Sequence, residues 1–300
     1  MTNKIKSSVL GFLIGLAVII PGFSGAQLSI MFKLYDKLMA ALSNLFNKKS
    51  ILFLLPIVLF AIVGFILGLF SIQKLLEISM FCVVLFFAGM MLGGIKTITK
   101  EIKGEKISVK RIVLLVVGLL IPISISILAC NVSYGDTNIL VSTPWYFYIF
   151  AIVIGFLIAM TQLIPGLSAT SLLMSLGLYD AFIKSVSLTF WKENPHVLLV
   201  YLMIVLGGIL GIVFISKAVN NLLKNHKGSF YFLVTGLCIS SLIAMFYNPE
   251  ILPFYQNFTS ANMTELIIGI VLFVIGTVFV YFVTSYADKK ELQNQEITNK

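Results

Sequence analysis

Six apolar stretches of about 20 residues constrain this chain most, because the hydrocarbon core of a bilayer, about 30 Å thick, needs roughly that many residues per helix. In lipid the backbone polar groups of such a stretch must pair with one another, which favours helices. Only 11% of the 300 residues are charged and 59% are hydrophobic, too little polar surface for a soluble globule. We therefore expect an all-α polytopic membrane protein. The stretches are Ile51–Ser71, Leu75–Ile95, Ile112–Cys130, Val197–Ser216, Ser229–Tyr247 and Leu266–Val283.

Two further apolar segments are each interrupted by a Pro-Gly pair. The first stops at Pro21-Gly22 and the second at Pro165-Gly166, and a shorter apolar run follows each break. Proline removes a backbone donor and clashes with the preceding turn, so a helix ends there. We expect each segment to form a broken helix hairpin inside the membrane, re-entrant in our interpretation, with two full crossings as the alternative. The runs are Val9–Ile20 with Ala26–Leu34, and Trp145–Ile164 with Thr170–Leu178.

The two broken segments align without a gap, 144 residues apart. From Gly11 the chain reads GFLIGLAVIIPGFSGAQLSIMFKLYD, and from Gly155 it reads GFLIAMTQLIPGLSATSLLMSLGLYD. Apolar composition alone would not place PGxS and LYD in the same register. We predict an internal duplication, residues 1–140 and 141–300, within one integral membrane domain. Each broken segment precedes three full spans, an odd number, so the repeats are inverted, as in many secondary transporters.

The distribution of positive charge predicts the orientation. In this topology eighteen of the 21 Lys and Arg residues fall on the face that carries both termini. The other face receives Lys74, Lys184 and Lys192. Because short cytoplasmic loops are enriched in Lys and Arg, we expect both termini in the cytoplasm.

The two breaks are the candidate site. A half-helix that starts near Ser24 or Ser168 would point free N–H groups and a positive dipole end into the membrane, an arrangement that binds phosphate or carboxylate. The serines add hydroxyl donors, and the glycines let a ligand approach the backbone. The alternative is a packing kink whose serine caps its own helix; two matched breaks favour the anion site. The candidate phosphate-binding residues are Gly22, Ser24, Gly25, Gln27, Gly166, Ser168, Ala169 and Thr170.

Lys33 is the charge that departs from the duplication, because its counterpart is Gly177. On a continuous helix it would share a face with Asp36 and lie about 13 Å along the axis from Ser24, too far to hold the same anion. Two interpretations stay open: an ion pair with Asp36, or an entrance or staging site at the cytoplasmic mouth. For Tyr35 and Asp36 themselves we expect a solvated helix end with the tyrosine as an interfacial anchor.

The reactive side chains are few. Two His and three Cys lie far apart, without CxxC spacing, so we expect no metal site, no disulfide, no cofactor and no catalytic residues. The net charge of +9 does not indicate nucleic-acid binding, because the lysines are scattered between apolar spans. The expected partners are a lipid phosphate substrate and membrane lipids. A coupling ion or proton and the oligomeric state are left open.

The two PGxS segments, each followed by LYD, resemble the bacterial polyprenyl-phosphate transporter family, formerly a domain of unknown function. The resemblance spans nearly the whole chain. The family motifs usually read PGVSGGT and PGISGS, where this chain has PGFSGAQ from Pro21 and PGLSAT from Pro165. The departures at Ala26-Gln27, Lys33 and Ala169 fall at the candidate site.

This resemblance implies a function. It implies a multi-pass transporter, a flippase that returns undecaprenyl phosphate to the cytoplasmic leaflet of the bacterial inner membrane for cell wall biogenesis. The alternative is a secondary transporter or channel for a small soluble anion, which would use the same half-helix dipoles with a closed aqueous path. A membrane enzyme acting on the same lipid would need clustered acidic, His or Arg side chains near one leaflet, which the sequence lacks.

Overall fold

The computed structural model describes residues 2–17, 24–131, 137–247, 249, 251–259 and 262–298, and every regular element among them is helical. Within these residues seven helical stretches are long and apolar enough to cross a membrane. The prediction of an all-α polytopic membrane protein is therefore confirmed. The stretches are Lys48–Gly68, Ile78–Lys100, Val109–Asn131, Trp145–Leu163, Val197–Asn225, Lys227–Phe246 and Met263–Ser285.

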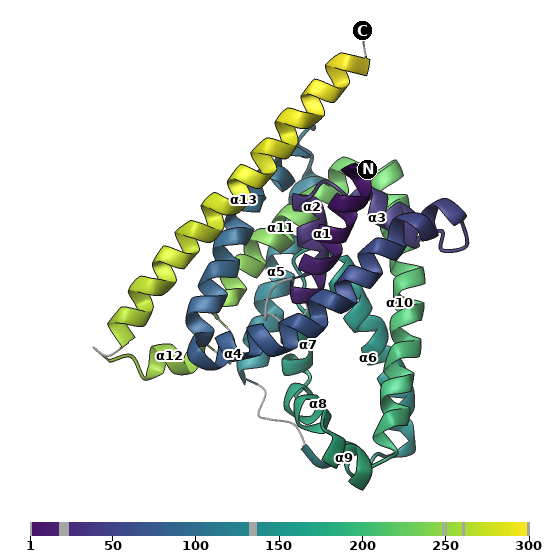
Figure 1. Ribbon diagram of the computed structural model, residues 1–300, viewed down its shortest axis with the longest axis vertical. Helices are drawn as coiled ribbons and strands as arrows, with labels where there is room; N and C mark the ends of the chain where they lie inside the picture. Colours follow the sequence, from purple (N-terminus) through teal and green to yellow (C-terminus); the bar gives the residue numbers. More distant parts are fainter. Residues whose placement is uncertain are drawn as a thin grey trace.

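The helices vary widely in length, and the short ones follow the two breaks. Figure 1 shows the start of α1 and the end of α13 at one end of the molecule, with α8, α9 and α12 at the other. In chain order the helices are α1 (Thr2–Ala17), α2 (Gly25–Met31), α3 (Tyr35–Leu42), α4 (Lys48–Lys100), α5 (Val109–Asn131), the 3-10 helix η1 (Thr137–Leu140), α6 (Trp145–Leu163), α7 (Ala169–Ser175), α8 (Tyr179–Ser185), α9 (Leu188–Glu193), α10 (Val197–Asn225), α11 (Lys227–Phe246), α12 (Leu252–Gln256) and α13 (Met263–Thr298).

Helix α4 contains two of the predicted spans. Its backbone leaves the helical region at Ser79, with φ −161° and ψ 99°. The Ser79 hydroxyl accepts a hydrogen bond from the Cys82 N–H at 3.0 Å, so it caps the second half of α4. The chain changes direction along α4, and its two halves diverge in Figure 1.

The main packing contacts of the fold are between pairs of long helices that cross at glycine residues. Helix α1 packs along the first half of α4, and α6 packs along α10. A Cβ atom at Gly11 would overlap the carbonyl oxygen of Ile57, and one at Gly155 would overlap that of Ile204. Small residues at these positions let the helix backbones approach closely. The second half of α4 packs on α13 and α5 packs on α11, again with glycine at the crossings.

A left-handed turn separates α2 from α3, and it explains why glycine stands at the position equivalent to Lys33. Lys33 has φ +56°, and its counterpart Gly177 has φ +68°. The Lys33 N–H donates to the Ile30 carbonyl and the Leu34 N–H to the Ser29 carbonyl, both at 2.8 Å. This is the Schellman pattern, in which glycine is favoured because it has no Cβ. The expectation of a continuous helix through Lys33 is wrong: α2 ends before it, and Asp36 lies in the first turn of α3.

We expect Lys33→Gly to be more stable than Lys33→Ala by about 1 kcal/mol, because both variants remove the side chain and only alanine keeps the Cβ that disfavours a positive φ. Reversible unfolding in detergent measures the difference. At the equivalent turn, Gly177→Ala is expected to be destabilised by a similar amount. Equal stability of the glycine and alanine variants of Lys33 would show that this turn carries no backbone strain.

Candidate functional site

The first break is closed by a capping box. The Ser24 Oγ accepts a hydrogen bond from the Gln27 N–H at 3.5 Å, and the Gln27 Oε1 accepts one from the Ser24 N–H at 3.0 Å. Ser24 is fully buried and Gln27 is 1% exposed. Buried polar groups need such partners, and the glutamine supplies one at a position where the family motif usually has threonine. The interpretation that the serine caps its own helix therefore describes the observed geometry. Pro21 and Gly22 lie outside the described residues.

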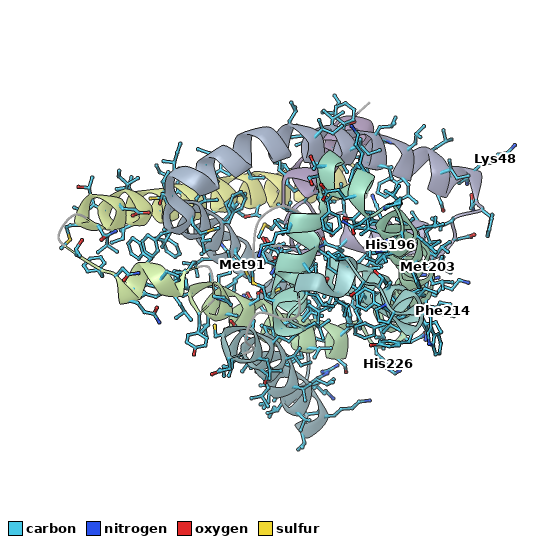
Figure 2. The ribbon with its side chains drawn as sticks, turned by 90° about the horizontal axis from the view of Figure 1, so that it is seen from below. Lys48, Met91, His196, Met203, Phe214 and His226 are labelled. Atoms are coloured by element: carbon cyan, nitrogen blue, oxygen red, sulfur yellow. The ribbon has the colours of Figure 1, made fainter. Side chains whose placement is uncertain are left out.

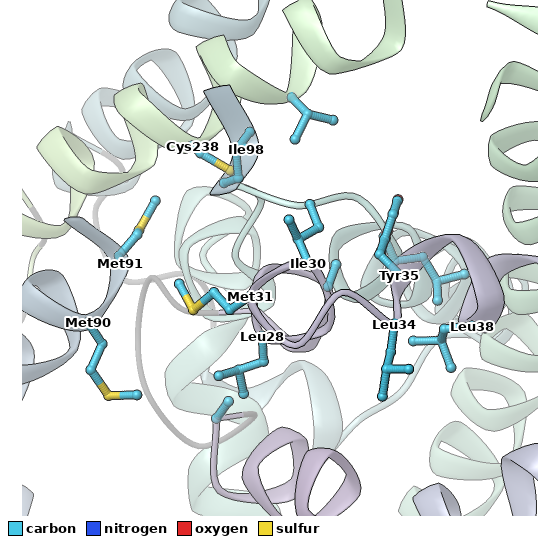
Figure 3. Close-up of a cluster of buried hydrophobic side chains, with 14 of the residues drawn as sticks. Leu28, Ile30, Met31, Leu34, Tyr35, Leu38, Met90, Met91, Ile98 and Cys238 are labelled. Atoms are coloured by element: carbon cyan, nitrogen blue, oxygen red, sulfur yellow. The ribbon is translucent and has the colours of Figure 1, made fainter. Parts of the chain in front are cut away.

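The amide nitrogen of Gln27 links this break to α11 and α4. The Nε2 atom donates to the Ser241 hydroxyl at 3.3 Å and lies 3.5 Å from the Met91 sulfur. The Ser241 hydroxyl in turn donates to the Cys238 carbonyl at 3.2 Å. In Figure 3, α2 lies among apolar side chains that include Met91 and Cys238, so this network sits in an otherwise apolar core.

The second break is also capped by its serine side chain and is less buried than the first. The Ser168 Oγ accepts a hydrogen bond from the Ser171 N–H at 3.3 Å and lies 2.8 Å from the Thr170 hydroxyl. Ser168, Ala169 and Thr170 are half-buried. Gly166 has φ +91°, and the space that a Cβ atom would take there is filled by the backbone of Leu237 on α11. This glycine therefore permits close packing of the break against α11.

A small pocket lies beside Ser168. Its volume is about 20 Å³, enough for about one water molecule. Three hydroxyl-bearing residues line it together with apolar side chains of α5 and α11. The lining residues are Pro122, Ile125, Gly166, Leu167, Ser168, Ser171, Ser241, Ala244 and Met245.

Ser241 is the residue that brings the two breaks together, and the sequence analysis did not single it out. On one side its hydroxyl accepts a hydrogen bond from Gln27, and on the other side the residue lines the pocket beside Ser168. The signal in the sequence is weak, a Ser240-Ser241 pair inside an apolar span. The structure thus joins Gln27, Gly166 and Ser168 of the predicted set through α11.

Tyr35, the first residue of α3, supports the second break. Its hydroxyl donates to the Leu163 carbonyl at 2.9 Å, and the side chain is 1% exposed. Leu163 is the last residue of α6, where a helix leaves carbonyl groups without an intrahelical partner. The expectation that Tyr35 is an interfacial anchor is wrong, because the ring is buried and its hydroxyl serves a helix end.

Asp36 belongs to a charged cluster at the end of the molecule where α11 begins. The Lys227 Nζ lies 3.3 Å from the Asp36 carboxylate and 2.9 Å from that of Glu101, the C-cap of α4. The Tyr231 hydroxyl donates to Asp36 at 3.1 Å. Lys227 and Asp36 are about half exposed, so each ion pair contributes at most about 1 kcal/mol. The cluster ties the start of α3 to α4 and α11.

Cys82, Cys130 and Cys238 are free thiols. Within the described ranges no three His, Cys, Asp or Glu side chains come together as a metal site.

With this geometry in place, the chain can be compared with known proteins. A family model described as undecaprenyl phosphate translocase-like matches residues 76–263, well over half of the chain. The chain belongs to this family. The matched range contains the second break and α11.

The resemblance inferred from the PGxS and LYD motifs is thus confirmed at the level of the undecaprenyl phosphate translocase-like family. A polyprenyl-phosphate transporter from Staphylococcus aureus is 25% identical over 271 residues, which cover 89% of this chain and 91% of that relative. No solved structure matches the chain.

In this member of the undecaprenyl phosphate translocase-like family, we expect Tyr35→Phe to lower the free energy of unfolding by about 1–3 kcal/mol. The change removes only the donor to the buried Leu163 carbonyl, and an unpaired buried acceptor costs about that much. Tyr146→Phe is the matched control, since Tyr146 is exposed. Unfolding in detergent compares the two. If both variants are as stable as the parent, the hydroxyl does not support the second break.

Proposed function

We propose that this protein carries a polyprenyl phosphate, such as undecaprenyl phosphate, across the bacterial cytoplasmic membrane, as a flippase that recycles the carrier lipid for cell wall biogenesis. Family membership and the S. aureus relative named as a polyprenyl-phosphate transporter support the substrate class. The observation that carries the proposal is the pocket beside Ser168, where Ser168, Ser171 and Ser241 line one small space among apolar helices.

Hydroxyl groups in such a place suit a lipid phosphate. The tail of the substrate is soluble in the bilayer, whereas its charged head strongly resists leaving water unless hydrogen-bond donors replace the lost hydration. Serine hydroxyls and nearby backbone N–H groups make charge-assisted hydrogen bonds to phosphate oxygens. Helices α2 and α7 have only seven residues each, so we assign the contact to these individual donors rather than to a long helix dipole.

The pocket volume of about 20 Å³ is smaller than a phosphate group, so substrate entry requires a change of conformation. We propose that α7 separates from α5 and α11 when the head group enters. In the closed arrangement the Ser168 hydroxyl caps α7, and in the open one it turns to the phosphate. Alternating access around a fixed site of this kind is typical of transporters built from repeats.

We propose that residues 1–140 and 141–300 are inverted repeats. The matched helix pairs support this: α1 with the first half of α4 corresponds to α6 with α10, and the second half of α4 with α13 corresponds to α11 with α5. The capping serines and the turns at Lys33 and Gly177 also match.

We also propose that both hairpins are re-entrant. Helix α6 has 19 residues, enough to cross a membrane by itself, whereas the sequence analysis treated it as half of a broken segment. Re-entry is supported by α8, which packs against η1, the short helix that precedes α6, so the chain comes back to the level where α6 began.

We expect both termini to be cytoplasmic, because the lysine-rich end of the molecule carries the start of α1 and the end of α13 (Figure 1). In a background without Cys82, Cys130 and Cys238, a cysteine at position 192 should react with an impermeant reagent in whole cells. One at position 103 should not. The reverse pattern would invert the assignment of the two faces.

The proposed phosphate contact is tested by changing Ser168 to two residues that both cap helices well, asparagine and aspartate. Ser168→Asp places a negative charge against the phosphate, so we expect transport of a fluorescent polyprenyl phosphate in proteoliposomes to fall at least tenfold. Ser168→Asn keeps a neutral cap of the same shape, so transport should fall less than threefold. A tenfold fall corresponds to a barrier increase of about 1.4 kcal/mol, and a threefold fall to about 0.65 kcal/mol.

Equal loss in both variants would indicate a packing role for Ser168 instead of a phosphate contact. Detergent unfolding of the two variants checks that the cap is intact. If the parent protein transports inorganic phosphate but not the lipid phosphate, the alternative function replaces the proposed one. That alternative is transport of a small soluble anion.

A further inference from the structure

A second, larger pocket lies between α3 and the end of α10, away from both breaks. Its volume is about 380 Å³, within the range of small-molecule sites. Six polar side chains line it, and none of them is acidic. They are Ser43 and Asn44 at the end of α3, and Lys217, Asn220, Asn221 and Lys224 on α10.

The length of α10 places this pocket at the level of lipid head groups. The helix has 29 residues, about 44 Å at 1.5 Å per residue, whereas the hydrocarbon core is about 30 Å thick. Its apolar part, Val197–Ser216, fills that core. The final turns, from Lys217 onward, therefore extend into the head-group region.

The four α10 residues present positive charge and hydrogen-bond donors on one face. Their spacing of three, four and seven residues aligns them along the helix. The Asn225 Nδ2 donates to the Asn221 Oδ1 at 2.6 Å, which engages the acceptor of Asn221 and leaves its N–H groups for a ligand. The Asn220 Nδ2 donates to the Ser43 hydroxyl at 2.9 Å, which fixes the α3 wall. Two ammonium groups with an amide donor between them match the charge and acceptors of a phosphate.

An apolar face continues from the pocket toward the middle of α10. Phe214, Leu210 and Leu206 precede Lys217 by three, seven and eleven residues, so they share its face. Their exposed fractions are 61%, 47% and 43%. Figure 2 shows Phe214 and Lys48 at the edge of the molecule, while Met91 lies among the helices. A lipid tail can lie along this face while its head group occupies the pocket.

We propose that the pocket between α3 and α10 is a docking site for phosphomonoester head groups, which holds the lipid phosphate in the leaflet next to the lysine-rich face before or after it crosses. The identity of the tail rests on the proposed function, whereas the phosphate chemistry rests on Lys217, Lys224 and Asn221. A free phosphate ion shares that chemistry, so the test separates the two sources.

The experiment measures binding of geranylgeranyl phosphate, geranylgeraniol and inorganic phosphate to purified protein in detergent. The titration uses the Ser168→Asp background, so that the break contributes no phosphate binding. Lys217→Gln with Lys224→Gln should weaken binding of the lipid phosphate about tenfold, the factor that two exposed ion pairs provide together. Lys184→Gln with Lys192→Gln, two exposed lysines on the opposite face, is the matched control and should change nothing.

The outcomes separate the two claims. Unchanged binding of the lipid phosphate in the Lys217 and Lys224 variant overturns the docking site, even if the parent protein transports the lipid. If inorganic phosphate or geranylgeraniol binds as tightly as geranylgeranyl phosphate, the lipid-phosphate assignment is overturned. A tenfold loss confined to the Lys217 and Lys224 variant supports the docking site, whether or not the parent protein transports the lipid. Failure of the proposed function would be seen separately, in the proteoliposome assay.

Discussion

The hydrogen bond from the Tyr35 hydroxyl to the Leu163 carbonyl holds the two breaks in one arrangement. Helix α6 ends inside the protein, where a free carbonyl group has no water to pair with and would cost about 1–3 kcal/mol. The donor comes from α3, which follows the other break. The next residue, Asp36, is paired with Lys227 and Tyr231 at the start of α11. One LYD motif therefore pairs with the end of α6 and also joins α3 to the start of α11.

Helix α11 is the element that both breaks share. Gln27 reaches it through Ser241, and Gly166 packs directly against the backbone of Leu237. Ser241 also lines the pocket beside Ser168, so this one serine of α11 belongs both to the hydrogen-bond network of the first break and to the pocket of the second. Any movement that opens the pocket for a head group must change contacts of α11. We therefore propose that entry of the head group at the second break is linked to the packing of the first.

Local patterns in the sequence predicted most of the fold. Apolar runs located the membrane-crossing helices, and the PGxS motifs located two caps, including the alternative in which Ser24 and Ser168 cap their own helices. The failures have different causes. Tyr35 looked like an interfacial anchor because its acceptor lies 128 residues away in the sequence. Ser241 gave little signal because one serine in an apolar span is common. The pocket between α3 and α10 gave none, because its two walls come from distant parts of the sequence. The turn at Lys33 was missed because lysine rarely adopts a positive φ.

A structure determined with undecaprenyl phosphate bound would test the central claim most directly. We expect phosphate density within hydrogen-bonding distance of the Ser168 and Ser241 hydroxyls, with α7 displaced from α11 and the small pocket beside Ser168 widened. A bound lipid whose phosphate contacts neither serine, while the pocket beside Ser168 stays closed, would contradict it.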